Sequence, residues 1–397
     1  MRIVHVLHEF PYPENSGMRC DMGRRLAAFA HLEHSVFAIA WLPREQNPTR
    51  SDIAALEAVT DERALIRIGQ STGERLRRIW NMRRHPSFVA ARIPPKERRE
   101  ALIEQVRDWR PDLIWLEGAH PCWMALELSR RLNVPLAYRA HNVEHRYLAM
   151  QAKLAPNWRK ALGIWAGAWR LESRELLLHR EAMRVFDISI DDIQYWRARG
   201  LENSSWLAPQ PDPDIVATAA VKNEDRDIDL LFMGGLSRAN NIAGLDWYFN
   251  EVHPLVNQRL GPHKLTIAGR EPPPSLVKRA AEVGAELIAD PRDAAPLFAR
   301  ARVMMNPILH GSGVNIKTVD MLATGRTVVT TTKGARGLPA EVVAELRTAD
   351  TPEGFADLVV EAVRAARAEA GGADRAALVQ RIFGAQAVAD ALAEVAA

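Results

Sequence analysis

A glycine-rich segment in the C-terminal half is the strongest chemical feature of this 397-residue sequence. The apolar run Val303–Pro307 is followed by Gly311 and Gly313, and then by a helical pattern that carries Lys317 and Asp320. Glycines before a helix let the backbone approach an anion, and the N–H groups of a helix N-terminus favour phosphate. Lys317 adds a cation, and Asp320 can accept hydrogen bonds from two vicinal hydroxyls, such as those of a ribose. The spacing therefore predicts a nucleotide-diphosphate site.

Two further apolar runs in this half also end in glycine. One leads into Gly234-Gly235 and the other into Gly269. Three such strand ends in one domain predict a crevice at the carboxyl edge of a parallel sheet. The residues predicted to bind the nucleotide diphosphate and the group attached to it are Gly235, Arg238, Asn241, Gly269, Arg270, His310, Gly311, Ser312, Gly313, Val314, Asn315, Lys317 and Asp320.

Short apolar runs alternate with longer helical patterns along the whole chain. Continuous runs of Val, Ile, Leu and Phe are typical of strands buried on both faces, as in a parallel sheet covered by helices. The alternation occurs twice, which predicts an α/β chain with two Rossmann-like, doubly wound domains at residues 1–207 and 208–375, followed by a helix at 376–397. The expected strands are Ile3–Leu7, Ser35–Trp41, Leu113–Leu116, Leu136–Ala140, Phe186–Ser189, Asp229–Met233, Lys264–Ala268, Ala285–Ile288, Val303–Pro307 and Thr327–Thr331.

The boundary is expected at Ala208–Asp214, where three prolines in seven residues forbid a helix. Two Asp-x-Asp triplets lie nearby, at Asp212–Asp214 and Asp227–Asp229. We interpret the first as a linker turn and the second as the approach to a strand, rather than as metal ligands.

The motifs of residues 229–340 resemble those of group 1, family 4 glycosyltransferases. The resemblance is carried by Phe232-Met-Gly-Gly-Leu with Asn241, by Leu265–Gly269, by Pro307–Thr330 and by Gly334–Leu338. It implies the GT-B fold, with two facing domains and a cleft between them. It also implies transfer of a sugar, with retention, from a nucleotide-diphosphate donor. We expect neither a metal nor another cofactor.

One position departs from the family pattern. Relatives usually carry two glutamates eight residues apart, the second where Asp320 stands, whereas the first position is Ser312 here, with His310 the nearest alternative. Two other functions therefore stay open: a nucleotide-sugar 2-epimerase, and a non-catalytic nucleotide-sugar-binding subunit of a larger complex.

The N-terminal half is expected to face the acceptor. Glu117 and His120 follow one predicted strand and His141 follows the next, so these three are the predicted catalytic residues, able to move protons or to bind sugar hydroxyls. The family resemblance implies that the loop before the first helix closes over the donor phosphates or the acceptor, and an ordinary βα loop is the alternative. The residues assigned to that loop and to the acceptor side are Gly17, on the donor phosphates, and Ser16, Asn142 and Glu144, on the acceptor.

Basic and aromatic residues are concentrated in the first half. Residues 1–205 carry a net charge of +7 and residues 206–397 carry −4, and Arg75–Arg99 contains nine basic residues. Such a pattern suits an anionic membrane surface or a lipid-linked acceptor, or simply solvated helix faces. For Trp158, Trp165 and Trp169 we favour tryptophans packed into the protein.

The composition is that of an ordinary globular protein. Cys20 and Cys122 are the only cysteines, so neither a disulfide framework nor a zinc site is supported, and a reducing cytoplasm is expected. No signal peptide or apolar run of membrane-spanning length is evident. We therefore expect a cytoplasmic enzyme, peripheral to the inner membrane, that elongates a glycan or lipid-linked glycan of a cell-surface polysaccharide. Nucleic acid is not an expected partner.

Overall fold

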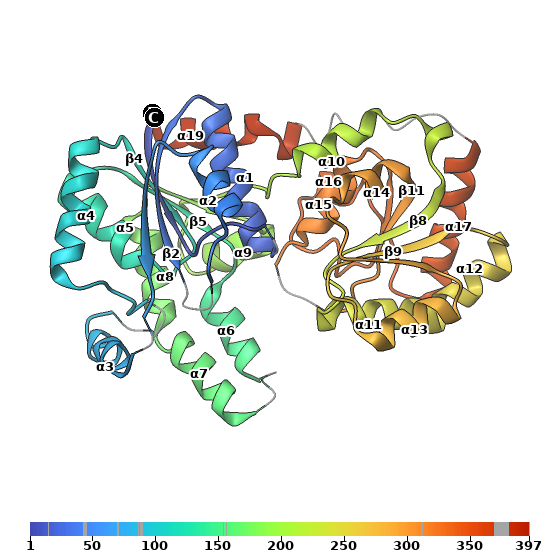
Figure 1. Ribbon diagram of the computed structural model, residues 1–397, viewed down its shortest axis with the longest axis horizontal. Coiled ribbons are helices and arrows are strands. Elements are labelled where there is room, and N and C mark those ends of the chain that lie inside the picture. The colour runs from blue at the N-terminus through green and yellow to red at the C-terminus, as the bar shows by residue number, and fades with distance from the viewer. Residues whose placement is uncertain are drawn as a thin grey trace. The chain divides into compact units, whose positions relative to one another are not determined.

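The computed structural model describes residues 1–14, 16–42, 46–69, 71–85, 87, 90–153, 155, 157–310, 313–368 and 381–396. The chain divides into two compact units (Figure 1). Unit 1 comprises residues 1–208 together with 385–397, and unit 2 comprises residues 209–384.

Unit 1 is built on a seven-stranded parallel sheet in the order β3-β2-β1-β4-β5-β6-β7. The chain moves outward from β1 in one direction and from β4 in the other, so the order reverses between these two strands. The strands are β1 (Arg2–Leu7), β2 (Ser35–Leu42), β3 (Glu62–Arg67), β4 (Leu113–Glu117), β5 (Leu136–Ala140), β6 (Arg184–Asp187) and β7 (Ser204–Trp206). The helices are α1 (Gly17–His31), α2 (Arg50–Glu57), α3 (Thr72–Asn81), α4 (Lys96–Trp109), α5 (Cys122–Leu132), α6 (Glu144–Lys153), α7 (Trp158–Ala168), α8 (Leu171–Glu181), α9 (Ile190–Arg197) and α19 (Ala385–Ala396).

The two faces of this sheet are covered by different helices. Successive side chains of a strand point to opposite faces. Ile3 and Leu7 of β1 therefore join one apolar core, whereas Val4 and Val6 join the other. The first core includes Val388 and Leu392 of α19, which lies against α1 (Figure 1).

Unit 2 contains a six-stranded parallel sheet in the order β10-β9-β8-β11-β12-β13, and its order reverses between β8 and β11. The strands are β8 (Ile228–Met233), β9 (Leu265–Gly269), β10 (Glu286–Ala289), β11 (Ala301–Asn306), β12 (Thr327–Thr330) and β13 (Arg347–Thr348). The helical segments are α10 (Pro213–Ala217), the short 3₁₀ turns Thr218–Ala220 and Asn223–Asp225, α11 (Ala239–Trp247), a π-helical turn Tyr248–Val252, α12 (His253–Leu260), α13 (Pro274–Glu282), α14 (Ala295–Arg300), α15 (Ile316–Ala323), α16 (Ala340–Val343) and α17 (Pro352–Ala368).

The fold class predicted from the sequence is confirmed, since both units are Rossmann-like parallel sheets with helices on both faces. Three strands were not predicted. The edge strand β3 carries charged residues such as Glu62 and Arg63 instead of a continuous apolar run, and β7 and β13 are only three and two residues long. The first aspartate of each Asp-x-Asp triplet has a partner within the protein. Asp212 caps α10, and Asp227 forms an ion pair with Arg300.

One packing prediction is wrong. Trp158 and Trp165 of α7 are not packed into the protein, because they are 70% and 56% exposed. Gly167 is the buried residue of this helix. Among the described residues, no helix combines the length and the apolar character that crossing a membrane requires.

Candidate functional site

The donor-side residues of unit 2 meet where β8 and β11 end. Lys317 in the first turn of α15 donates from Nζ to Oδ1 of Asn241 on α11, over 2.7 Å. Asn241 in turn donates from Nδ2 to the carbonyl oxygen of Gly235, over 2.8 Å. The Lys317 ammonium also lies 4.5 Å from the ring centroid of Phe232. The reversal point of a doubly wound sheet is where ligands of such folds bind.

The charge of Lys317 has no counter-ion in the part of the chain that the structure describes. Its neighbours are an amide, an aromatic ring and the Gly234 backbone. Burial in these surroundings lowers the pKa of Lys317 to about 7. An anion placed there would restore the ordinary pKa, so the site favours a phosphate or diphosphate.

Gly269 brings the end of β9 against the end of β8. It has a φ of +156°, and a Cβ at this position would lie 1.6 Å from the carbonyl oxygen of Gly234. Only glycine permits this close approach. The neighbouring predicted residues Arg238 and Arg270 are exposed at the same edge of the sheet, and Arg238 is also the residue that precedes α11.

The rest of the glycine-rich segment is placed as follows. Gly311 and Ser312 lie outside the described residues, His310 is exposed, and Gly313 has a left-handed φ of +72°. Val314 is partly buried, and Asn315 precedes the first turn of α15. Asp320 is buried, and its Oδ1 accepts a hydrogen bond from the backbone N–H of Asp212 over 3.0 Å. A ribose would therefore compete with this backbone contact for one oxygen of the carboxylate.

A buried polar network that the sequence analysis missed holds α15 against the sheet. Asn306 at the end of β11 donates to Oγ1 of Thr318 over 2.9 Å, and Thr318 donates to the carbonyl oxygen of Gly334 over 3.1 Å. Thr330 of β12 donates to the carbonyl oxygen of Asn306 over 2.8 Å. The network fixes the first turn of α15, and with it Lys317. Asn306, Thr318 and Thr330 are uncharged and distant from one another in sequence, so their pairing could not be predicted from a local pattern.

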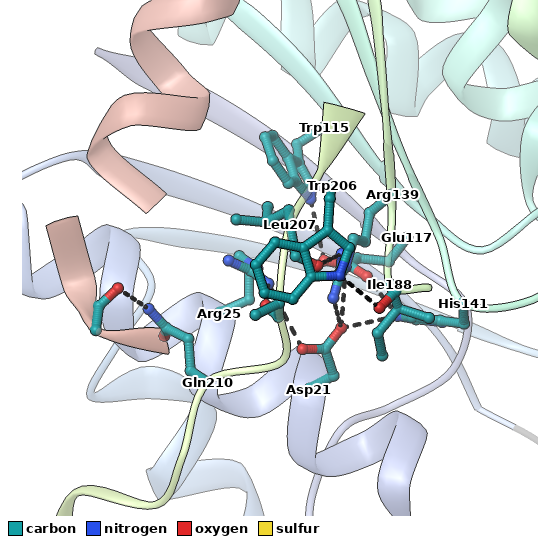
Figure 2. Close-up of polar contacts among 12 residues, drawn as sticks. Asp21, Arg25, Trp115, Glu117, Arg139, His141, Ile188, Trp206, Leu207 and Gln210 are labelled. Atoms are coloured by element: carbon teal, nitrogen blue, oxygen red, sulfur yellow. Dashed lines mark hydrogen bonds and ion pairs between the residues drawn. The ribbon is translucent and has the colours of Figure 1, made fainter. Parts of the chain in front are cut away.

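In unit 1, Glu117 and His141 belong to a buried ionic cluster at the carboxyl ends of β4 and β5 (Figure 2). His141 Nε2 lies 2.9 Å from Glu117 Oε2 and 3.2 Å from Asp21 Oδ2. Arg139 forms an ion pair with the same Asp21 oxygen at 3.0 Å, and Arg25 approaches the other oxygen at 3.5 Å. The cluster links helix α1 to two central strands.

The cluster fixes the charge of its members. Burial opposes protonation of His141, but its contacts with Asp21 and Glu117 outweigh burial and raise its pKa to about 9. Burial would raise the pKa of Glu117, but hydrogen bonds from His141 and His5 hold it well below its usual value. Trp115 also donates to Glu117 over 3.0 Å. Because Glu117 is fully buried with both oxygens engaged, this arrangement suits the positioning of His141 rather than contact with a substrate.

Asp21, Glu117 and His141 are the described residues that come together as three potential metal ligands. Their surroundings fit a metal ion poorly. His141 is already protonated at neutral pH, and two guanidinium groups, from Arg25 and Arg139, share the Asp21 carboxylate. The positive charge that two carboxylates require is therefore supplied by the chain itself.

The predicted catalytic residue His120 pairs with His8, at the point where the strand order of unit 1 reverses. His120 Nδ1 lies 3.0 Å from His8 Nε2, and its Nε2 lies 3.9 Å from Glu144 Oε2. Burial lowers the pKa of both histidines, that of His8 to about 3, so both are neutral at pH 7. Burial, with Glu175 nearby, raises the pKa of Glu144 to about 7. We call His8, His120 and Glu144 the acid–base row. Because the pKa of Glu144 lies near 7, this row can take up or release a proton near neutral pH.

The remaining predicted residues of unit 1 lie at helix starts. Ser16 caps α1 by accepting from the N–H of Arg19 over 3.4 Å, and Gly17 is the exposed first residue of that helix. Asn142 donates to Glu144 over 3.5 Å at the start of α6. Asp21, Arg25, Arg139, His5 and His8 were not predicted, because the contacts that join them to Glu117, His120 and His141 connect segments far apart in the sequence, such as Asp21 with His141 and His8 with His120.

Comparison with known proteins identifies the domain that holds Lys317. Residues 227–365 match the family model described as Glycosyl transferases group 1. Unit 2 carries a group 1 glycosyltransferase domain. The matched segment contains the strand ends at Gly235 and Gly269 and the whole of α15, so Lys317 and its contacts lie within it.

A protein described as lying in the cps region of Klebsiella pneumoniae, with a mass of 44.6 kDa, is 34% identical to the chain over 117 residues. The alignment covers 28% of this chain and 30% of that protein, so the chain spans about a third of the length of this curated relative.

Solved structures share the two-unit architecture of this chain at low identity. The HepE protein of Anabaena, in complex with UDP, has a TM-score of 0.59 and 13% identity, with 99% of this chain and 100% of that one covered. TarM of S. aureus, in complex with UDP, fondaparinux and α-GlcNAc-glycerol, has a TM-score of 0.66 and 9% identity, with both chains fully covered. These likenesses show that the fold is GT-B.

Proposed function

We propose that this chain is a glycosyltransferase that uses a nucleotide-diphosphate sugar. The observation that carries the proposal is Lys317, a cation without a counter-ion among the described residues, held by Asn241 at the reversal point of the sheet in a group 1 domain. A leaving diphosphate develops negative charge as the glycosidic bond to it breaks. A preorganised cation and helix N-terminus stabilise that charge.

The donor side of the proposal uses Lys317 for the diphosphate, with Gly235, Gly269 and the start of α15 admitting its oxygens close to the backbone. Asp320 is proposed to bind the ribose. Several structures of this fold contain UDP, which makes uridine the first base to test. Nothing in this scheme requires a metal ion, since Lys317 and backbone N–H groups meet the charge.

The acceptor side of the proposal uses the row His8, His120 and Glu144, which can accept the proton that an attacking hydroxyl loses. Glu117 positions His141 next to this row. We propose transfer with retention to a glycan or a lipid-linked glycan, in a polysaccharide pathway, and the relative in the cps region supports that setting. We also propose that the chain works in the cytoplasm at the inner membrane face.

The decisive experiment measures donor binding and transfer separately. Thermal shift with UDP reports binding, because a ligand of the folded state stabilises it in proportion to its occupancy. Lys317→Met is expected to abolish the shift, whereas Lys333→Met, which removes an exposed lysine of the same unit, leaves it unchanged. His120→Ala is expected to keep the shift and lose transfer.

Product analysis separates the two other functions. A nucleotide-sugar 2-epimerase would convert a UDP-sugar without an acceptor. A non-catalytic subunit would bind UDP-sugars but consume none of them, with or without acceptor glycans from the source membrane. Either outcome would refute the transferase proposal, and an inverted anomeric centre in the product would refute retention.

A further inference from the structure

Two helices of unit 1, α3 and α7, turn apolar side chains toward the solvent. Leu76, Ile79 and Trp80 of α3 are 58% to 67% exposed. Of the eleven large apolar residues exposed in the described chain, seven belong to α3 and to α7 with its C-cap. In α7 and its C-cap these are Trp158, Leu162, Trp165 and Trp169.

The stripe on each helix is continuous. Residues at positions i, i+4, i+7 and i+11 of an α-helix lie on one face. Trp158, Leu162, Trp165 and Trp169 have this spacing. Leu76, Ile79 and Trp80 have the equivalent i, i+3, i+4 spacing. Both helices are therefore amphipathic with the apolar face outward, the reverse of a helix that covers a core.

The polar face of α3 is the one that contacts the protein. Arg78 donates to the carbonyl oxygen of Gly69 over 3.3 Å, and Arg77 pairs with Glu74 of the same helix at 3.8 Å. Burial, with Arg75 and Arg77 nearby, lowers the pKa of Arg78. Trp80, which is 67% exposed, therefore lies on the side of the helix opposite to this polar contact.

The two stripes lie on neighbouring parts of unit 1. The segment after α3 is joined to the α7 region by two hydrogen bonds: Ser87 Oγ donates to the carbonyl oxygen of Gly167 over 2.5 Å, and Arg174 donates to that of Arg84 over 3.3 Å. Figure 1 shows α3 and α7 at the same end of unit 1. We treat these two helices together and call residues 71–85 and 157–170 the α3–α7 surface.

This surface is strongly basic. It contains eight lysines and arginines against Glu74 alone, a net charge of +7, whereas the whole chain has +3 and the remainder of the chain therefore −4. The cations accompany the aromatic rings. The guanidinium carbon of Arg83 lies 4.8 Å from the ring centroid of Trp80, that of Arg159 lies 5.4 Å from Trp158, and that of Arg170 lies 5.8 Å from Trp169.

A pocket of about 130 Å³ adjoins α3 on its polar side. Five arginines line it, against one glutamate. Such a lining suits the phosphate of a lipid headgroup. The charged lining residues are Arg67, Glu74, Arg77, Arg78, Arg92 and Arg98.

We infer that the α3–α7 surface docks onto an anionic phospholipid bilayer. Tryptophans insert at the level of the headgroups, and arginines beside them bind phosphate. A second copy of this chain is the less suitable occupant, because a two-fold interface would place one +7 surface against another. The inference deepens the proposed membrane partner and assigns it to named residues.

The test is co-sedimentation of the full chain with vesicles, at low and high salt. We expect binding to phosphatidylcholine vesicles that contain about one-third phosphatidylglycerol, weakening as salt rises, and little binding to pure phosphatidylcholine. Arg83→Gln with Arg159→Gln should weaken binding about tenfold or more, since each basic residue near the surface contributes about 1 kcal/mol. Trp80→Ser with Trp158→Ser should weaken it to a similar degree.

Matched controls come from exposed residues elsewhere. Met183→Ser with Val277→Ser removes two other exposed apolar groups, and Lys278→Gln with Lys333→Gln removes two charges. Both control proteins should bind as the wild type does. Wild-type protein that fails to bind the anionic vesicles at low salt, or a tryptophan variant that binds normally, would overturn the inference.

Sedimentation velocity tests the other occupant. A wild-type dimer that the tryptophan variant abolishes would assign the surface to a second copy and refute lipid docking. The UDP thermal shift should be the same in all these variants. Loss of vesicle binding with a retained UDP shift therefore affects only this inference, whereas absence of the UDP shift in the wild type affects the proposed function.

Discussion

Replacing Lys317 with methionine should stabilise the ligand-free protein and at the same time abolish donor binding. The pKa of Lys317 falls from 10.5 to about 7 on burial, which corresponds to roughly 5 kcal/mol against the charged form. Near pH 7 about 4 kcal/mol of this cost is present. The lost hydrogen bond to Asn241 offsets about 1 kcal/mol. The net gain is therefore about 3 kcal/mol, or roughly 6–12 °C in the unfolding of unit 2.

The sign of the pH dependence is fixed by the direction of the shift. Between about pH 7 and 10.5 the unfolded chain binds a proton at Lys317 that the folded chain does not, so this residue makes the wild type more stable as pH rises. The advantage of Lys317→Met should be largest at or below pH 7 and should vanish near pH 10.5. The difference between the two proteins cancels the contributions of other titrating groups, such as His141.

Calorimetric or fluorescence-monitored unfolding, with and without UDP, provides the measurement. Lys317→Arg keeps the charge and should show no gain in stability. The reasoning would be falsified if Lys317→Met melted below the wild type at pH 7, or if UDP still stabilised it by the wild-type amount. Either result would mean that Lys317 has a counter-ion in the folded protein or does not bind the diphosphate.

Three further substitutions test other parts of the structure. His141→Gln should cost about 3 kcal/mol in urea unfolding near pH 6, and because the folded pKa is raised from 6.5 to about 9, the cost should disappear as pH rises through 9; a pH-independent cost would contradict this. Gly244→Ala places a Cβ 2.0 Å from a backbone oxygen and should weaken UDP binding, whereas Gly163→Ala, with open space around it, should be neutral or stabilising; equal effects would refute the steric argument. Asn241→Asp gives Lys317 a fixed counter-ion, so UDP affinity should fall and no longer depend on pH between 7 and 9, as isothermal titration calorimetry can measure.

The fold could be predicted from the sequence because each central strand is buried on both faces and is therefore a continuous apolar run, such as Ile3–Leu7. The edge strand β3 escaped prediction since half of its residues face solvent and carry charge. On the donor side, the glycines and Lys317 stood out in the sequence. Glycines before a helix let the backbone approach an anion, and a lysine in the first turn is unfavourable unless an anion is bound there.

In unit 1, the partners of the predicted residues could not be found from the sequence. Glu117 and His141 were recognised as residues capable of acid–base chemistry, but Asp21, which pairs with His141, lies on α1, more than a hundred residues earlier in the chain. No local pattern reports such pairing. The exposure of Trp158 was equally beyond reach, because helical spacing defines a face but not the direction in which that face points.

The return of α19 to unit 1 means that this unit is built from two separate segments of the chain. Val388, Leu392 and Val395 complete the apolar core on one face of the first sheet, yet they are separated from it in sequence by all of unit 2. Unit 2, in contrast, is one continuous segment of the chain, residues 209–384. Unit 1, although it is synthesised first, keeps one face of its core open until α19 emerges, so the domain that begins the chain is the last to be completed.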